Sequence, residues 1–411
     1  MTKYTVLYFE QKFTNVYKCQ TYAIDRKKKA ANQQNNNDML TNISKSQVPD
    51  ILTPNVNQLP ILILTHNRVN ALQSLLLSLR SLINDFHKNI DLSVQFPVVV
   101  SIDSTDRATI DISRRLADHV IIAPANKEIY GASNLNVRQR YRQIASHYKF
   151  AFNSIFNLNE TNFNDIIVLE DDLELAPDFL VYFYKLRTLL HMDKSILTIS
   201  AWNDNGLSEL VSSTHSKQLL HRTDFFPGLG WILTKDLWDE LSIKWPDIYW
   251  DDWLRNPTQM KSRACIRPEV SRVSMSRWAK RGASNGLYFD YIGRIVHSMC
   301  LATEWLQLNL RDLEILVKDK YDIIFDQKLS ACRSKGNSEI YLNDDIKTNK
   351  FIWSPNEPCE IITCNTAAET VEILKSYNLM SDIFSSFYRT VYRGYVQVVK
   401  NDKRIFIKTA T

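Results

Sequence analysis

The feature that most constrains the fold is a group of three carboxylates, Glu170, Asp171 and Asp172, which directly follows the apolar run at residues 166–169. A short apolar run is typical of a buried strand, and unpaired charge at the end of such a strand is costly. We therefore expect the carboxylates to hold a positive group. In open α/β sheets, ligands bind at the carboxyl ends of the strands, so the candidate is a divalent metal carrying a phosphorylated ligand. A solvated acidic loop is the alternative.

The composition is that of an ordinary globular protein. The chain has 411 residues, of which 45% are hydrophobic and 23% are charged, so it is long enough for two domains. The net charge of +5 is small for this length, and we expect no nucleic-acid partner. The nine glycines form neither G-x-G-x-x-G nor G-x-x-x-x-G-K, which argues against dinucleotide-binding and P-loop sites.

Residues 1–57 are predicted to form a disordered tail or stalk. Residues 26–37 read RKKKAANQQNNN, a segment too polar to bury a core. No apolar run approaches the roughly 18 to 20 residues that a membrane span requires, and the apolar opening is too short for a signal peptide. We therefore expect neither an anchor nor a signal peptide in this sequence.

The cysteines are scattered, without a C-x-x-C pair, so a structural zinc site is not expected. Their pairing stays open, because in a chain of this size they fit a secretory lumen or a buried core equally well. The six are Cys19, Cys265, Cys300, Cys332, Cys359 and Cys364.

Hydrophobic periodicity predicts strands that alternate with helices after Pro60. Strands are expected at residues 61–64, 98–102, 120–123 and 166–169, and helices at residues 72–83, 110–116 and 137–155. This alternation is typical of a mostly parallel sheet wound with helices.

Polar side chains follow three of these strands and are expected to share one rim of the sheet. Arg68 comes after the first strand, Asp103 after the second, and the three carboxylates after the fourth. The planar fork of an arginine suits a phosphate, and Asp103 could accept hydrogen bonds from a base or ribose. Together they predict a nucleotide site, although Asp103 could instead cap a helix.

Two aromatic segments downstream predict a sugar site with a general base. Residues 222–231 place Gly228 and Gly230 between aromatic side chains, which would form a sugar-binding floor or a plain hydrophobic turn. Asp251 and Asp252 are enclosed by tryptophans, whose apolar rings favour the raised pKa of a general base. One of the two could also cap a helix beginning near Trp253.

The order of these motifs resembles glycosyltransferase family 13. The likeness covers roughly residues 58–400, is strongest at 165–290 and is faint beyond, where Tyr392-Arg-Gly394 is the last clear fragment. The motifs that carry it are Glu170-Asp171-Asp172 with the following residues to Asp178, Ser200-Ala-Trp-Asn-Asp-Asn-Gly206, Arg222 to Trp231, Lys244-Trp-Pro246, Trp250-Asp-Asp-Trp253 and Arg267-Pro-Glu-Val-Ser-Arg272.

The resemblance implies a GT-A glycosyltransferase fold, which is Rossmann-like with a mostly parallel mixed sheet flanked by helices, and a smaller C-terminal α/β domain. It places the nucleotide-sugar-binding catalytic domain at residues 58–279, a linker or closing loop at 280–292 and the smaller domain at 293–411. Members are normally Golgi type II membrane proteins, so the resemblance implies a membrane-associated protein of the Golgi lumen.

The activity implied is inverting, Mn²⁺-dependent transfer of GlcNAc from UDP-GlcNAc. The acceptor would be the α-1,3-linked mannose of a high-mannose (Man5) glycoprotein N-glycan, joined in β-1,2 linkage to initiate hybrid and complex N-glycans. Transfer to protein O-linked mannose is an alternative, as is a catalytically inactive protein that binds sugar nucleotides. The intact Trp250-Asp-Asp-Trp253 favours the N-glycan enzyme, and retention of both Asp172 and Asp251 argues against an inactive one.

Site roles are carried over residue by residue. Matching positions imply that Arg68, Asp103 and His147 contact the donor nucleotide, and that Glu170 and Asp171 contact nucleotide and sugar. Asp172 resembles the single protein ligand of the metal, and Asp251 resembles the catalytic base. A donor contact on a closing loop is implied at Ser284.

The resemblance also implies two disulfides that this chain lacks. His66 and Ser104 occupy one pair of cysteine positions, and Thr198 is expected to face Cys265 in the other. Disulfides typically contribute about 2 to 4 kcal/mol each, so other interactions are expected to compensate.

Overall fold

A computed structural model describes residues 57–124, 135–157, 163–212, 218–279, 286, 288–306, 310–333, 349, 351–353 and 357–410. The tail predicted at residues 1–57 lies outside this part except for its last residue. No helix in these ranges is long and apolar enough to cross a membrane.

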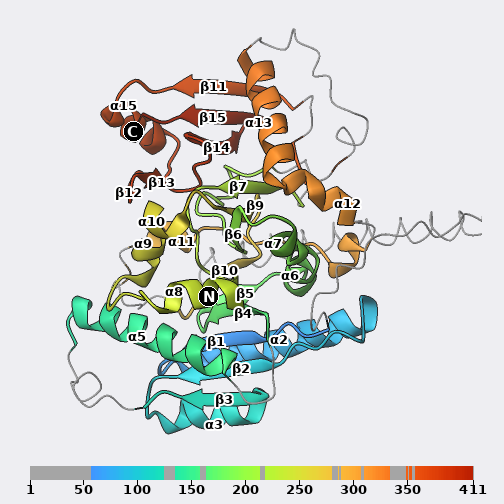
Figure 1. Cartoon of the computed structure of the whole chain (residues 1–411), viewed down its shortest axis with the longest axis vertical. Helices are drawn as coiled ribbons and strands as arrows, with labels where there is room; N and C mark the ends of the chain where they lie inside the picture. Colours follow the sequence, from blue (N-terminus) through green and yellow to red (C-terminus); the bar gives the residue numbers. More distant parts are fainter. Residues whose placement is uncertain are drawn as a thin grey trace, which may run out of the picture.

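The large sheet contains five strands in the order β3-β2-β1-β4-β8 (Figure 1). Four of them are parallel, and β8 runs antiparallel to β4 at the edge. The prediction of a mostly parallel sheet is therefore confirmed. The strands are β1 (Ile61–Thr65), β2 (Val98–Ile102), β3 (His119–Ile122), β4 (Asp165–Glu170) and β8 (Trp231–Thr234).

Helices cover both faces of this sheet because alternate side chains of a strand point to opposite faces. Ile61 and Ile63 of β1 join one hydrophobic core with α2 (Val69–Asn89) and α3 (Arg107–Leu116). Leu62 and Leu64 join a second core with α5 (Val137–Phe156). The predicted helices are confirmed, each within a few residues of its expected start.

A second, smaller sheet has the order β6-β9-β7, and β5 pairs separately with β10. In the register of β6 and β9, Thr198 is the partner of Cys265, as expected. The elements of this middle part are β5 (Leu173–Leu175), α6 (Phe179–Leu186), α7 (Thr188–Met192), β6 (Ile196–Ile199), β7 (Leu220–Thr223), α8 (Lys235–Ser242), α9 (Trp250–Leu254), α10 (Pro257–Met260), β9 (Ala264–Pro268), β10 (Val273–Met275) and α11 (Phe289–Ile292).

The C-terminal part contains a three-stranded sheet in the order β11-β15-β14, which lies at the opposite end of the molecule from β2 and β3 (Figure 1). Its elements are η1 (Ala302–Trp305), α12 (Leu310–Leu313), η2 (Glu314–Leu316), α13 (Lys318–Arg333), β11 (Cys359–Thr363), α15 (Ala367–Ser376), β12 (Ile383–Phe384), β13 (Phe387–Tyr388), β14 (Tyr395–Lys400) and β15 (Lys403–Lys408).

Buried charges join this C-terminal sheet to the middle part. Arg404 of β15 is fully buried, with Nε 2.9 Å from Glu357 and Nη1 3.4 Å from Glu269. Glu269 also lies 2.6 Å from Nε2 of His221 on β7. Burial opposes ionisation of Glu269, but Arg404 and the His221 hydrogen bond together hold its pKa well below the usual range. One charged network thus connects strands far apart in the sequence.

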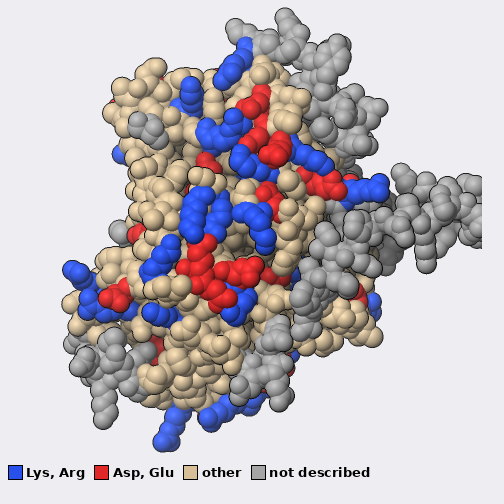
Figure 2. Space-filling view, in the orientation of Figure 1, with Lys and Arg blue, Asp and Glu red and all other residues tan. Residues whose placement is uncertain are grey.

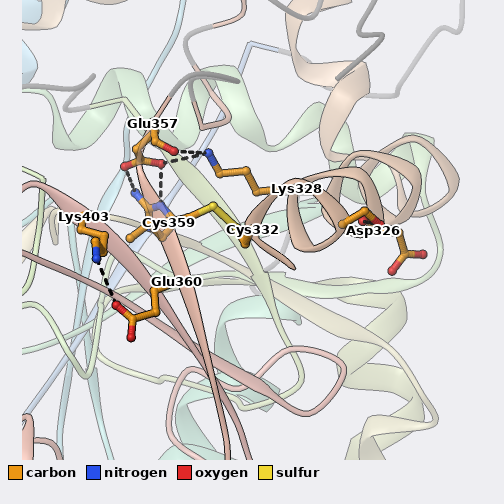
Figure 3. Close-up of a disulfide and its surroundings, with 9 residues drawn as sticks. Asp326, Lys328, Cys332, Glu357, Cys359, Glu360 and Lys403 are labelled. Atoms are coloured by element: carbon orange, nitrogen blue, oxygen red, sulfur yellow. Dashed lines mark hydrogen bonds and ion pairs between the residues drawn. A yellow bond between two sulfur atoms is a disulfide. The ribbon is translucent and has the colours of Figure 1, made fainter. Parts of the chain in front are cut away.

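A disulfide between Cys332 and Cys359 joins α13 to β11 beside this network (Figure 3). One turn earlier on α13, Lys328 donates a hydrogen bond to the carbonyl oxygen of Glu357 at 2.8 Å. The disulfide and this hydrogen bond therefore hold the same helix against the same segment. Cys265, Cys300 and Cys364 are buried cysteines that take no part in the disulfide, and Cys19 lies outside the described residues.

Charged side chains of both signs gather around α8, in the middle of the face that Figure 2 shows. Here Lys194, Lys235, Glu240 and Arg263 line a polar pocket of about 430 Å³. The described residues of this face therefore carry charges of both signs side by side.

Replacing Arg404 tests the buried network. The variant Arg404→Met removes the cation that bridges two buried carboxylates and leaves Glu357 with only Lys328 at 3.9 Å, so we expect the free energy of unfolding to fall by about 3 to 5 kcal/mol. Urea unfolding followed by circular dichroism would measure it. As a matched control, Arg294 pairs with Glu209 at 3.0 Å, but both side chains are about half exposed. Arg294→Met should cost less than about 1 kcal/mol. Equal losses in the two variants would contradict the assigned role.

Candidate active site

The carboxyl ends of β1 and β4 bring the predicted carboxylates next to Arg68. The strands pair in parallel, so the segments that follow them lie side by side. Nη2 of Arg68 lies 2.9 Å from Oδ1 of Asp171, and Nη1 pairs with Asp172. Thr65 donates a hydrogen bond of 2.6 Å to the other oxygen of Asp171. Arg68 of the same chain is therefore one positive partner of these carboxylates.

A single arginine does not balance three carboxylates. Burial, with the nearby charge of Asp172, raises the pKa of Glu170 to about 7. Burial also raises the pKa of Asp171 to about 6, even though Arg68 opposes that shift. Tyr148 of α5 donates a hydrogen bond of 2.8 Å to Glu170. The excess of negative charge suits a site that receives a cation.

Asp103 forms a hydrogen-bond network beside this cluster. Its Oδ1 lies 2.7 Å from Nδ1 of His66, and its Oδ2 accepts a hydrogen bond of 3.0 Å from Gln143. Nδ1 of His147 lies 3.7 Å from the same Oδ2, and its Nε2 lies 2.9 Å from the hydroxyl of Ser101. The hydrogen bond with Asp103 raises the pKa of His66, whereas burial lowers the pKa of His147.

The helix-capping alternative for Asp103 is wrong. Asp106 is the N-cap of α3, where its side chain accepts a hydrogen bond of 2.8 Å from the backbone N–H of Thr109. Asp103 lies three residues earlier, so its oxygens are available to the imidazole and amide groups around it.

Only the second half of the segment 222–231 reaches the pocket. Arg222 is buried and pairs with Asp193 at 2.9 Å, a structural role. Gly228 and Gly230 have φ angles of 71° and 70°, and both line the pocket. A Cβ at Gly230 would lie 3.2 Å from the side chain of Ala201, so the turn requires glycine there.

Stacked tryptophans hold α9 on the side of the pocket opposite Arg68 and the three carboxylates. The ring of Trp250 stacks on Trp245 at 5.6 Å between centroids and on Trp231 at 6.0 Å. Tyr249, which precedes the helix, adopts a left-handed conformation with φ 51°. The start of α9 is thus fixed by aromatic packing.

Asp251 and Asp252 lie within the first turn of α9, so the alternative that one of them caps a helix near Trp253 is wrong. Arg255 Nη1 pairs with Asp251 at 2.9 Å and with Asp252 at 2.7 Å. Burial and the charge of Asp251 raise the pKa of Asp252. Both carboxylates remain partly exposed, at 37% and 42%.

A pocket of about 640 Å³ joins the two walls. Arg68, Glu170 and Asp172 line it together with Asp251, so four of the predicted site residues share one cavity. Residues from the C-terminal part, including Phe384, also reach it. The cavity is large enough for a sugar nucleotide, since ligand pockets typically measure about 300 to 1,000 Å³.

The other predicted residues lie beside or outside this cavity. Asp171 is buried behind Arg68, and Asp103 and His147 form the adjacent network without lining the pocket. Ser284 lies outside the described residues.

Several residues of the site were not predicted. Arg255 follows Asp251 by four positions, a helical spacing that could have indicated an ion pair. Tyr148 belongs to the predicted apolar face of α5, and nothing in that pattern indicates its contact with Glu170. Phe384 lies too far along the chain for any local pattern to reveal it.

The comparisons identify the class and then the family. The mixed sheet with helices on both faces belongs to the α/β class, as predicted. Residues 5–411 match the GNT-I family, and the chain belongs to that family. The resemblance found in the sequence is therefore confirmed.

The chain is 31% identical over 315 residues to an Arabidopsis thaliana protein described as alpha-1,3-mannosyl-glycoprotein 2-beta-N-acetylglucosaminyltransferase. The match covers 76% of this chain and 66% of the relative, so the chain spans slightly less than two thirds of the relative's length.

Two solved structures are similar at a distance. The mannosyltransferase PcManGT from Pyrobaculum calidifontis, in complex with GDP-Man and Mn²⁺, is 13% identical, with 54% of this chain and 58% of that chain covered and a TM-score of 0.31. Glucosyl-3-phosphoglycerate synthase from Mycobacterium tuberculosis is 14% identical, with 45% and 59% covered and a TM-score of 0.26. Likenesses this loose assign no function.

The pKa of Glu170 predicts how stability depends on pH. Because the folded-state pKa is raised to about 7, the folded protein binds a proton that the unfolded chain releases near the ordinary carboxyl value. Without metal or nucleotide, stability should fall as pH rises through this window. The Glu170→Gln variant lacks the titration, so its stability relative to wild type should increase between about pH 4.5 and 7. Urea unfolding of both proteins in EDTA would measure the difference, and a constant difference would contradict the assignment.

Proposed function

We propose that the protein is an inverting N-acetylglucosaminyltransferase that uses UDP-GlcNAc and Mn²⁺. It would join GlcNAc in β-1,2 linkage to the α-1,3-linked mannose of a Man5 N-glycan, the step that initiates hybrid and complex N-glycans. Membership of the GNT-I family supports the reaction class. The observation that carries the proposal is that Asp172 and Asp251, the proposed metal ligand and base, line the same pocket.

The donor side of the pocket fits a divalent metal with a diphosphate. Oδ1 of Asp172 is buried and has no hydrogen-bond partner among the described residues, whereas Oδ2 faces Arg68. No cluster of three or more metal-binding side chains occurs in the described ranges, so Asp172 would share the ion with the nucleotide. Mn²⁺ accepts such oxygen ligands and, when bound, would neutralise charge on the departing diphosphate.

Arg68 is placed to bind the diphosphate. Its side chain is 30% exposed and lines the pocket, so the guanidinium can turn from the carboxylates toward phosphate oxygens. Asp103 and His147 would hold the nucleoside. Glu170 and Asp171 would contact nucleotide and sugar, and Ser284 would contact the donor from the segment at 280–292, which ends with α11.

Asp251 would act as the general base. It would remove the proton from the 2-hydroxyl of the acceptor mannose while that oxygen forms a bond to the anomeric carbon of GlcNAc. The bond from this carbon to the UDP oxygen breaks on the opposite face, so the configuration inverts. The exposed part of the Asp251 carboxylate gives the acceptor a route to it.

We also propose the domain roles and location that follow from the family. Residues 58–279 would bind the nucleotide sugar and residues 293–411 would help shape the acceptor side. The working compartment would be the Golgi lumen, in association with the membrane.

A transfer assay on purified protein tests the proposal. UDP-GlcNAc and a Man5GlcNAc2 glycan are incubated with and without Mn²⁺, and the product mass is read. Metal-dependent gain of one N-acetylhexosamine supports the proposal. Transfer to an O-mannosyl peptide instead would replace the acceptor, and no transfer to either would overturn the enzyme assignment.

The base can be distinguished from its neighbour. Asp251→Asn should reduce kcat by about 10²- to 10⁴-fold, the usual contribution of a positioned general base. Asp252→Asn is a matched control on the same helix turn with the same arginine partner. It should cost less than about tenfold, and UDP binding by calorimetry should survive in both variants. If the Asp252 variant lost more activity than the Asp251 variant, the assignment would be reversed.

Replacing Asp172, the proposed metal ligand, should change the Mn²⁺ requirement of the reaction. Asp172→Asn replaces an anionic oxygen with a neutral one, so the Mn²⁺ concentration for half-maximal activity should rise by about tenfold or more. A Mn²⁺ titration at saturating UDP-GlcNAc would measure the shift. An unchanged requirement for Mn²⁺ would exclude Asp172 as the ligand.

A further inference from the structure

Arg255 is a buried residue whose guanidinium makes several polar contacts. Its side chain is only 7% exposed, although it lines the pocket. Nε donates a hydrogen bond of 3.1 Å to the carbonyl oxygen of Phe226, and Nη1 pairs with Asp251 and Asp252. These contacts fix both the plane and the rotation of the guanidinium, which a lysine could not reproduce.

Two aromatic rings from distant parts of the chain close on this guanidinium. The centre of the Arg255 guanidinium lies 4.6 Å from the ring centroid of Phe225 and 5.2 Å from that of Phe384. Phe225 follows β7, whereas Phe384 ends β12 in the C-terminal part. The centroids of these two rings are 6.2 Å apart, so the cation packs against an aromatic pair that the middle and C-terminal parts form together, an arrangement that favours arginine.

The position of Phe384 is itself fixed by a second arginine. Arg389 lies 5.1 Å from the Phe384 ring and 5.5 Å from the Phe225 ring. It pairs with Asp204 at 2.6 Å and with Asp382 at 3.0 Å. The hairpin of β12 and β13 is therefore attached to the middle part directly beside Arg255.

The arrangement has a consequence for Asp251. Arg255 Nη1 binds its Oδ2, and Oδ1 has no hydrogen-bond partner among the described residues. The ion pair therefore selects which oxygen remains for an acceptor hydroxyl. A helical ion pair alone would require neither burial of the guanidinium nor the aromatic pair beside it, since exposed pairs four residues apart form without such support.

We propose that Arg255 is the positioning residue of the general base, and that Phe384 of the C-terminal hairpin clamps it in place. This inference rests on the proposed function of Asp251. It gives the C-terminal part a role in the reaction step, because the hairpin would set the orientation of the base through Arg255.

Kinetics of three variants test the clamp. Arg255→Lys keeps the charge but not the fork, and Arg255→Ala removes both. We expect kcat to fall by about 10- to 100-fold in each, the scale of a small misplacement of a reacting group, with the KM for UDP-GlcNAc unchanged. Phe384→Leu should also lower kcat, but by a smaller factor than the Arg255 variants. Added methylguanidinium should restore part of the activity of Arg255→Ala, which a purely structural role would not allow.

The control is Arg263→Ala. Arg263 is also partly buried and forms a two-armed pair with Glu240 at 2.9 and 3.0 Å, but it lies at the polar pocket near α8. This variant should keep the wild-type kcat. If the Arg255 and Arg263 variants behaved alike, or if KM rose while kcat did not change, the proposal would be overturned.

A crystal structure of Arg255→Ala tests the positioning role of Arg255 even if the acceptor assignment fails. We expect the Asp251 side chain to leave its wild-type rotamer, and an unchanged rotamer would overturn the proposal. A wild-type protein that transfers nothing, combined with a displaced Asp251 in the variant, would reject the proposed function while supporting the positioning role of Arg255.

Discussion

The ion pairs of Arg68 with Asp171 and Asp172 are the interaction on which the rest of the site depends. They connect the segments that follow β1 and β4, two parallel neighbours at the centre of the large sheet. Burying several carboxylates beside one arginine is unfavourable on its own, as the raised pKa of Glu170 indicates. A cation bound at this cluster would stabilise it, and for this reason we place the metal and the nucleotide-sugar donor at this rim of the sheet.

The opposite wall depends on packing rather than charge. The tryptophan stack around Trp250 fixes the start of α9, and α9 then presents Asp251 to the cavity. The C-terminal part reaches the same wall through Phe384 and is joined to the middle part by the buried contacts of Arg404. The pocket is therefore shaped by segments that lie far apart in the sequence.

The sheet and its carboxylate rim could be predicted because periodicity and strand order are local properties. The strands at residues 61–65, 98–102 and 165–170 lie where the apolar runs indicated. The capping roles weighed for Asp103 and the Asp251–Asp252 pair were wrong, since Asp106 caps α3 and α9 begins earlier than expected. A cap is decided by backbone geometry at one residue, which composition does not reveal.

The contacts that join distant segments could not be predicted. Arg222 looked like part of a sugar-binding segment but is buried against Asp193, and Phe384 showed no local signal for its place beside Arg255. Such contacts depend on how the sheets pack against one another, which no periodic pattern encodes.

The most direct test of the central claim is a crystal structure of the protein with UDP-GlcNAc and Mn²⁺, with anomalous data collected at the manganese edge. The account predicts an anomalous peak beside Asp172, the diphosphate next to Arg68 and the sugar in the cavity that Asp251 lines. Nucleotide bound away from this rim, or a manganese peak without contact to Asp172, would contradict it.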